Sequence, residues 1–194
     1  MSITIDPPEL LFPHKVISSH NTEFHSYKDS MLGWMDSYIQ RNPTSNERSN
    51  AGGYQSPDDF YLEESFAPFL NILSEQIMST LDSYMHDTLL EDEDPLTLSN
   101  MWFNYNYRNC YNVCHTHPGC AVAGVFWIQV PEESPLIVFD CPLSHNSSII
   151  NPDTTRRYQP SEGTMLMFPA YLPHRVDLNG NDTTRISISF NLIQ

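Results

Sequence analysis

His115-Thr116-His117-Pro118-Gly119 is the stretch around which the rest of the chain can be organised. Side chains alternate between the two faces of a β-strand, so two histidines two residues apart on a strand place both imidazoles on one face. Imidazole is a ligand for iron, zinc, copper, nickel and manganese. Two imidazoles on one face, joined by a third from another strand, make a metal site with open positions. The rest of the chain is therefore expected to enclose such a site.

His174 is the candidate for the third ligand. It follows the segment from Gly163 to Pro173, which predicts a strand running into a proline-flanked turn and places His174 at a strand start. Further along the chain, Arg185 and Ser187 share one face of the last predicted strand. A guanidinium and a hydroxyl together suit a carboxylate. A metal beside a carboxylate site indicates a metal-chelating carboxylic acid as the ligand.

The regions outside these motifs change from a helical to an extended pattern. A period near 3.6 predicts helices over 23–40 and 62–86. Residues 43–59 are polar and turn-rich, and they predict either a lid or a disordered connector. After Pro95 the period becomes 2 and short segments are separated by Pro, Gly and Asn. The predicted strands are 98–107, 111–117, 121–130, 135–140, 164–168 and 185–193.

This order of elements predicts an α+β protein that is mainly β. The expected architecture is a double-stranded β-helix (jelly roll) with the N-terminal helices packed on one sheet. We expect a single domain over 1–194, with a helical flank over 1–95 and the β-helix core over 96–194.

The last predicted strand leaves its orientation open. Its polar face carries Arg185, Ser187, Ser189 and Asn191, and its apolar face carries the residues between them. Taken alone, the pattern favours a polar face in solvent and an apolar face in the core. The alternative packs the apolar face on the helices, and the polar face then lines the barrel interior.

Composition narrows the partners. The formal net charge is −15, with 9 basic and 24 acidic residues. Nucleic-acid binding depends mostly on basic residues that neutralise phosphates, so a nucleic-acid partner is not expected, and nor is an anionic membrane surface. No secretory signal is recognisable, which predicts a soluble protein of the cytoplasm. The four cysteines should then be reduced thiols. A homodimer remains open.

The second half of the chain resembles the non-haem Fe(II)/2-oxoglutarate-dependent oxygenases. Within that superfamily it is similar to a family of small 2OG-Fe(II) oxygenases common in marine bacteria and their phages. The matching stretches, with a weaker match over 50–56, are Trp102-Phe103-Asn104, Tyr111-Asn112-Val113-Cys114-His115-Thr116-His117-Pro118-Gly119, Gly124-Val125-Phe126-Trp127, Met167-Phe168-Pro169-Ala170-Tyr171-Leu172-Pro173-His174-Arg175-Val176 and Arg185-Ile186-Ser187-Ile188-Ser189-Phe190-Asn191.

The resemblance implies an oxidative chemistry. Fe(II) would be held by His115, His117 and His174, and the far carboxylate of 2-oxoglutarate would meet Arg185 and Ser187. With O₂, the products would be succinate, CO₂ and a hydroxylated substrate, which could be a protein side chain, a free amino acid or a small metabolite. Asn104, Asn106 and Asn112 are candidates for hydrogen bonds to the cosubstrate or to the histidine rings, and Asn104 and Asn112 are taken as cosubstrate-binding.

One position departs from the wider superfamily, which binds iron with two histidines and one carboxylate. His117 stands where that carboxylate is expected. Asp140, at the end of a predicted strand, is therefore an alternative ligand that could join or replace one of the histidines.

Two other functions fit parts of the pattern. The first is a cupin, acting as an isomerase, a binding module or a 2-oxoglutarate-independent oxygenase; it would need no Arg185. The second is a structural zinc module that uses Cys110, Cys114 and Cys120 beside the histidines. That spacing is not one of the usual zinc patterns, and alternation would turn Cys114 away from His115.

Overall fold

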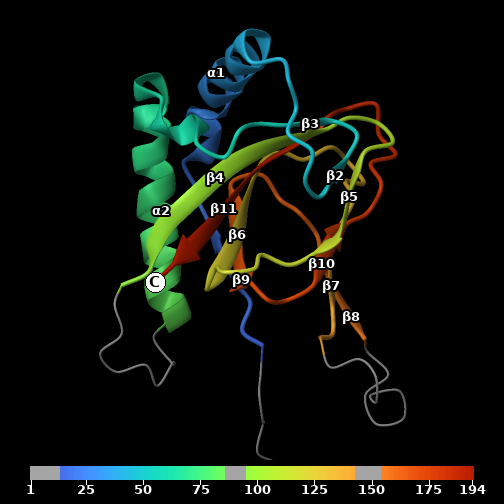
Figure 1. The fold of residues 1–194 in the computed structure, drawn as a ribbon. Coiled ribbons are helices and arrows are strands. Elements are labelled where there is room, and N and C mark those ends of the chain that lie inside the picture. Colours follow the sequence, from blue (N-terminus) through green and yellow to red (C-terminus); the bar gives the residue numbers. More distant parts are fainter. Residues whose placement is uncertain (1–13, 86–94, 143–153) are drawn as a thin grey trace, which may run out of the picture.

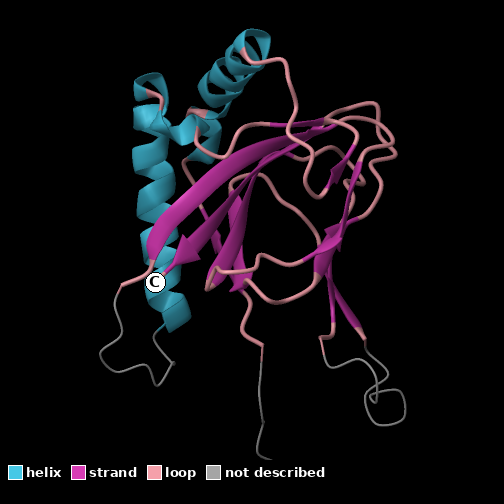
Figure 2. Ribbon diagram, in the orientation of Figure 1, coloured by secondary structure: helices cyan, strands magenta, loops and turns pink. Residues whose placement is uncertain are grey.

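Two antiparallel sheets face one another in the computed structural model, and two helices lie on the outer side of one sheet (Figures 1 and 2). The structure describes residues 14–85, 95–142 and 154–194. The chain is mainly β, and the arrangement is a double-stranded β-helix with its N-terminal helices packed on one sheet, as the sequence predicts.

The larger sheet has six strands among the described residues, in the order β1-β9-β6-β11-β4-β3. Its long central strands come from the second half of the chain. The strands are β1 (Ile17–His20), β3 (Tyr54–Gln55), β4 (Thr97–Asn106), β6 (Val122–Gln129), β9 (Thr164–Pro169) and β11 (Arg185–Ile193).

The smaller sheet has five described strands, in the order β2-β5-β10-β7-β8. They are β2 (Asn50–Ala51), β5 (Tyr111–His115), β7 (Ile137–Asp140), β8 (Thr155–Tyr158) and β10 (His174–Val176). Strands β8 and β10 are too short to show a period in the sequence. Strands β1, β2 and β3 come from the segment expected to be only a helical flank, so both halves of the chain contribute to the sheets.

The helices are α1 (Lys28–Arg41) and α2 (Ala67–Met85), with short 3₁₀ turns η1 (Phe24–Ser26), η2 (Phe60–Leu62) and η3 (Glu64–Phe66). Helix α2 begins later than the predicted residue 62. Pro68 explains this, because proline has no backbone N–H and is tolerated in the first turn of a helix but not in its interior. The predicted end at His86 lies outside the described residues.

The main core lies between the helices and the outer face of the larger sheet. Leu73, Ile77 and Leu81 on α2 are buried there, together with Ile188 and Phe190 of β11. The polar face of β11 is buried as well, against the interior between the sheets: Arg185 is 1% exposed. The interpretation that placed this face in solvent is therefore wrong, and the alternative is confirmed.

The segment 43–59 is ordered and joins the two sheets at one corner. Strand β2 pairs with β5 in the smaller sheet, and β3 pairs with β4 in the larger one. Between them Gly53 has φ +73°, and a Cβ at this position would lie 2.3 Å from the carbonyl oxygen of Tyr105. This close approach explains the glycine. A disordered connector does not describe this segment.

Candidate functional site

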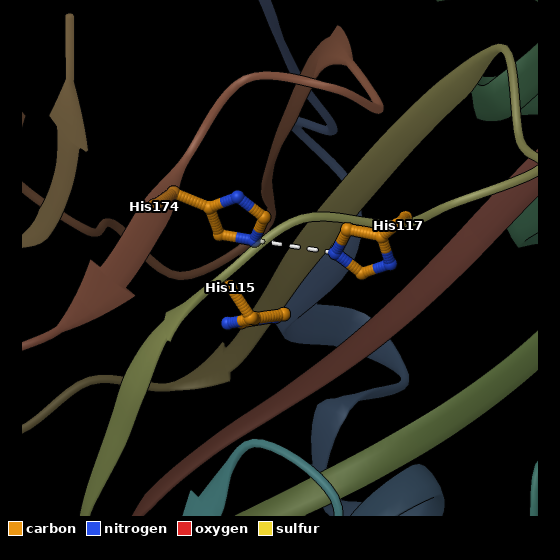
Figure 3. Close-up of side chains that lie close together, drawn as sticks. All are labelled: His115, His117 and His174. Atoms are coloured by element: carbon orange, nitrogen blue, oxygen red, sulfur yellow. Dashed lines mark hydrogen bonds between the residues drawn. The ribbon is translucent and has the colours of Figure 1, made fainter. Parts of the chain in front are cut away.

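The three histidines converge between the sheets, from the end of β5, the turn after it and the start of β10 (Figure 3). His115 is the last residue of β5 and pairs directly with His174, the first residue of β10. His117 lies two residues beyond the end of β5, and its backbone N–H donates to the carbonyl of Ala170 at 2.8 Å. The predicted strand 111–117 is therefore two residues too long. Strand alternation does not align His115 with His117; the turn after β5 brings the second ring back.

The spacing of the ring nitrogens suits one metal ion. Each histidine offers a nitrogen, and these atoms lie within 4.8 Å of one another. Nε2 of His117 and Nε2 of His174 are 3.3 Å apart. Two nitrogens that each lie about 2.1 Å from one ion are separated by roughly 3.0 Å at a right angle and roughly 3.4 Å at the tetrahedral angle. The separation of His117 and His174 falls in this range, so these two nitrogens fit a shared metal ion, and the nitrogen of His115 lies within 4.8 Å of both.

Hydrogen bonds to the backbone fix two of the three rings. Nδ1 of His115 donates to the carbonyl of Val113 at 2.8 Å, and Nδ1 of His174 donates to the carbonyl of Leu172 at 2.9 Å. A ring with its proton on Nδ1 has its lone pair on Nε2, and it is Nε2 of His174 that faces the cluster (Figure 3). Such partners set the tautomer and orientation of ligating histidines.

Burial keeps the three imidazoles neutral. It lowers the pKa of His115 from its ordinary value, lowers the pKa of His117 to about 4, and lowers the pKa of His174 to about 3. Repulsion from His115 adds to the shift at the other two positions. Desolvation disfavours the charged form of a base, so all three rings have free lone pairs at neutral pH.

Asp140 is engaged elsewhere. Nη1 of Arg175 donates to its Oδ1 at 2.7 Å, and the thiol of Cys114 donates to its Oδ2 at 3.4 Å. Among the described residues, the cluster with metal-ligand spacing contains histidines and neither Asp140 nor a cysteine. Asp140, the alternative ligand, is thus paired with Arg175 and lies outside the cluster. The geometry also gives no support to a structural zinc–thiolate module.

A narrow cavity extends from the histidines into the barrel, and Arg185 lines it. The side chain is fully buried, yet in the described part of the chain no carboxylate lies within ion-pair distance of it. Nη1 of Arg185 donates to Oγ of Ser187 at 3.4 Å, and Nε has no partner among the described residues. Burial lowers the pKa of Arg185 to about 10, which leaves it a cation at neutral pH. The site therefore offers an unpaired positive charge to a ligand.

Amide side chains line the same cavity. Asn112 donates from Nδ2 to Oγ of Ser49 and accepts at Oδ1 from Nδ2 of Asn106, each at 3.2 Å. Asn104 lies across from Ser187 in the pairing of β4 with β11. Its Oδ1 is buried and has no hydrogen-bond partner among the described residues. The predicted residues Asn104, Asn112, Arg185 and Ser187 thus line one cavity with the three histidines.

The comparisons with known proteins agree with this geometry. Residues 100–191 match the family model described as "Putative 2OG-Fe(II) oxygenase". By this match, residues 100–191 of the chain belong to the 2OG-Fe(II) oxygenase superfamily. Its cofactors are accordingly Fe(II) and 2-oxoglutarate, with O₂ as the second cosubstrate. No curated protein sequence matches the oxygenase.

Solved structures share the fold of the oxygenase at low sequence identity. The carbocyclase SnoK from nogalamycin biosynthesis, a non-haem alpha-ketoglutarate-dependent enzyme, has a TM-score of 0.70 at 8% identity, over 93% of this chain and 80% of its own. A prolyl hydroxylase from Trichoplax adhaerens has a TM-score of 0.67 at 14% identity, over 92% of this chain and 83% of its own. The viral collagen prolyl hydroxylase of Paramecium Bursaria Chlorella virus-1 has a TM-score of 0.61 at 12% identity, over 91% of this chain and 94% of its own. These likenesses establish the fold.

Some cavity residues were not expected from the sequence. Ser49 comes from the turn-rich segment 43–59, and nothing in the local pattern indicates that it reaches the site. Trp102 stacks on His117, with ring centroids 5.8 Å apart and an interplanar angle of 27°. Its motif is part of the family resemblance, but the motif does not show the contact.

None of the helices in the described part of the oxygenase is long and apolar enough to cross a membrane.

Proposed function

We propose that this oxygenase is a hydroxylase that binds Fe(II) through His115, His117 and His174 and 2-oxoglutarate through Arg185. O₂ would be the oxidant, and Fe(II) with 2-oxoglutarate would activate it: substrate C–H, O₂ and 2-oxoglutarate are converted into substrate C–OH, succinate and CO₂, with one oxygen atom entering the hydroxyl group and the other entering succinate. The chain contributes the binding, the orientation and the exclusion of water around that reaction.

The observation that carries the proposal is the buried, unpaired Arg185. Removing a guanidinium from water costs several kcal/mol unless an anion or a set of acceptors compensates it. The described residues supply only one long contact, to Ser187. A carboxylate accepts a two-pronged hydrogen bond from a guanidinium, and the Ser187 hydroxyl adds a third. A dicarboxylic acid that also chelates a metal satisfies both ends of the cavity.

The amide side chains of the cavity are uncharged, so their role is to orient the ligand and not to neutralise its charge. 2-Oxoglutarate presents only acceptors, so the amides can bond to it only through their Nδ2 hydrogens. Asn112 has a second Nδ2 hydrogen beyond the one bonded to Ser49, and Asn104 carries an Nδ2 donor beside its unpartnered Oδ1, which needs a donor such as an ordered water. Buried polar atoms without partners are rare, and a ligand or an ordered water usually satisfies them. We assign Asn104 and Asn112 to the cosubstrate on this basis.

The cavity measures only about 40 Å³, so 2-oxoglutarate enters only if part of the wall moves. The segment that bears Ser49 is a candidate for this movement, because its strands β2 and β3 are only two residues long. Its contacts with the site include the Ser49–Asn112 hydrogen bond and the N–H of Val113 donating to the Ser49 carbonyl at 2.8 Å. We infer that segment 43–59 serves as the lid that the sequence suggested.

The primary substrate has a separate approach. A pocket of about 500 Å³, which shares His115, His117 and Trp102 with the cavity, opens beside the histidines. Its size suits a small molecule or a single side chain of a larger one. Exposed Arg48 lies on its wall with no ion-pair partner among the described residues, so it favours a substrate with an acidic group. Two of the structural neighbours named above are prolyl hydroxylases and one is a carbocyclase, and we take hydroxylation as the reaction to test first.

The test is binding followed by turnover. Under anaerobic conditions, Fe(II) and 2-oxoglutarate together should give a metal-to-ligand charge-transfer band, and admission of O₂ should give slow succinate formation without a primary substrate. The Arg185→Met variant should lose both. Neither signal with the wild type would leave the cupin alternative ahead, because a cupin has no requirement for 2-oxoglutarate.

A further inference from the structure

His117 differs from the other two histidines in how its ring is held. His115 and His174 each donate from Nδ1 to a backbone carbonyl two residues earlier in the chain. His117 has no such carbonyl among its described hydrogen bonds, although it occupies the place of the usual carboxylate ligand. Among the described residues, the hydrogen-bond contact of its side chain runs from Nε2 to Nε2 of His174, and Asn191 lines the same pocket as His117.

Asn191 lies on β11 and presents a buried oxygen without a donor. The residue is 5% exposed, and its Oδ1 has no partner in hydrogen-bonding geometry among the described residues. Asn191 and His117 line the same pocket, and the interaction between them raises the pKa of His117 against the larger effect of burial. The buried Oδ1 is therefore an acceptor that a donor from the His117 ring could satisfy.

Two further hydrogen bonds settle which end of the Asn191 amide faces His117. Asp58 can only accept, so Asn100 donates to it from Nδ2, at 3.3 Å to Oδ2. Oδ1 of Asn100 therefore faces Asn191 and accepts from its Nδ2 at 2.8 Å. Asn100 and Asn191 are direct partners in the register of β4 and β11, which holds the two amides together. The amide oxygen of Asn191 is the end left for His117.

We propose that Asn191, oriented through Asn100 by Asp58, accepts the Nδ1–H of His117 and so directs Nε2 of His117 to the metal. With its proton on Nε2, His117 can bond to His174 but gives Asn191 Oδ1 no donor. With its proton on Nδ1, it satisfies that oxygen and points a lone pair toward the other two histidines. Asn191 is thus a positioning residue, and a carboxylate stands at the end of the relay.

The inference rests on the proposed function, because it takes His117 as a metal ligand, but it is tested without turnover. Co(II) is the probe, titrated into the full chain without 2-oxoglutarate and followed by its visible absorption. Asn191→Leu keeps the side-chain shape and removes the acceptor. We expect it to weaken Co(II) binding by about 10- to 100-fold, the usual effect of removing a partner of a ligating histidine.

Asn191→Asp is the matched variant, because it keeps an acceptor opposite His117. It should bind Co(II) within about threefold of the wild type, whereas a purely structural role of Asn191 would make the two variants equally weak. Thermal unfolding verifies that each variant is folded. Equal loss in both variants, or wild-type binding by Asn191→Leu, would overturn the inference.

A measurement on the unmodified sequence does not depend on the variants. In ¹⁵N-histidine NMR of the Zn(II)-loaded protein, His117 should show a slowly exchanging Nδ1–H, and a proton on Nε2 would overturn the inference. Co(II) binding that responds to Asn191 while 2-oxoglutarate is never consumed would overturn the proposed function alone. No Co(II) binding by the wild type would overturn both.

Discussion

The two faces of strand β11 are both buried, but they do opposite things for the molecule. The apolar face, with Ile188 and Phe190, packs against the helix-covered core and contributes to folding. The polar face carries Arg185, Ser187 and Asn191 into the barrel interior, where Arg185 has no acidic partner in the described part of the chain. One strand therefore holds a stabilising surface and a surface that costs stability until a ligand binds.

Replacing Arg185 by Met gives the largest expected effect. The Michaelis constant for 2-oxoglutarate should rise on the order of 10²–10³-fold, because the carboxylate loses its buried partner. The free energy of unfolding should stay the same or rise by about 1 kcal/mol, because a buried cation is replaced by an apolar side chain. Succinate assays and thermal unfolding measure the two quantities.

The control is Arg157→Met, which removes an equal charge from an exposed position on β8. It should leave the Michaelis constant unchanged. If Arg185→Met destabilised the fold strongly while binding 2-oxoglutarate normally, the polar face would be a structural surface and the comparison would fail.

Replacing Ile188 by Ala tests the opposite face. The side chain is fully buried in the core, so the free energy of unfolding should fall by about 2–5 kcal/mol through lost burial and the cavity left behind. Chemical denaturation measures the change, and Leu178→Ala, at a position that is 53% exposed, should fall within about 0.5 kcal/mol of wild type. The folded fraction of Ile188→Ala should bind 2-oxoglutarate with unchanged affinity. A matching loss of affinity would show that the faces are not independent.

How much of this could be read from the sequence depends on the range of the interaction. Alternation along β11 places Arg185 and Ser187 on one face, and the structure confirms that they share it. Alternation cannot say what covers a face, because that depends on where the helices and the second sheet lie. The pattern of this strand taken alone therefore favoured the wrong environment for the polar face, whereas the expected carboxylate site at Arg185 and Ser187 favoured the right one.

The histidine cluster was predicted for a partly wrong reason. His115 and His117 were expected on one strand, but β5 ends at His115 and the following turn returns His117 to the cluster. His174 arrives through the pairing of β10 with β5, which joins residues 59 positions apart. Ser49 and the relay to Asn191 depend on such long-range register and leave no periodic signal. The family resemblance supplied what local pattern could not.

His117, the histidine in place of the usual carboxylate ligand, allows a sharper test of the polar interior. His117→Ala should weaken Co(II) binding about 100-fold, because one of three ligands is lost, whereas His117→Asp restores the two-histidine, one-carboxylate set of the wider superfamily. We expect the Asp variant to bind Co(II) within about tenfold of wild type in an absorption titration. Wild-type affinity in the Ala variant would show that His115 and His174 suffice, and that His117 is not a ligand.

The last expected effect separates the two faces of β11 by pH. The pKa of His117 is lowered to about 4 and that of His174 to about 3, chiefly by burial, from an ordinary value near 6.5. Between pH 6.5 and about 4 the unfolded chain binds more protons at these positions than the folded one does, so the free energy of unfolding falls as the pH falls. The slope is at most about 1.4 kcal/mol per pH unit for each histidine.

Denaturation with a chelator present, from pH 7 to pH 4, measures this slope. Carboxylates titrate in the same range, so the wild type is compared with the His115→Gln/His117→Gln/His174→Gln variant, whose curve should be flatter between pH 6.5 and 5. Ile188→Ala should lower the whole curve without changing its slope, because the apolar face contains no titrating group. Identical slopes in the wild type and the triple variant would mean that the buried histidines do not couple folding to protons, and the distinction between the two faces of β11 would then rest on Arg185 alone.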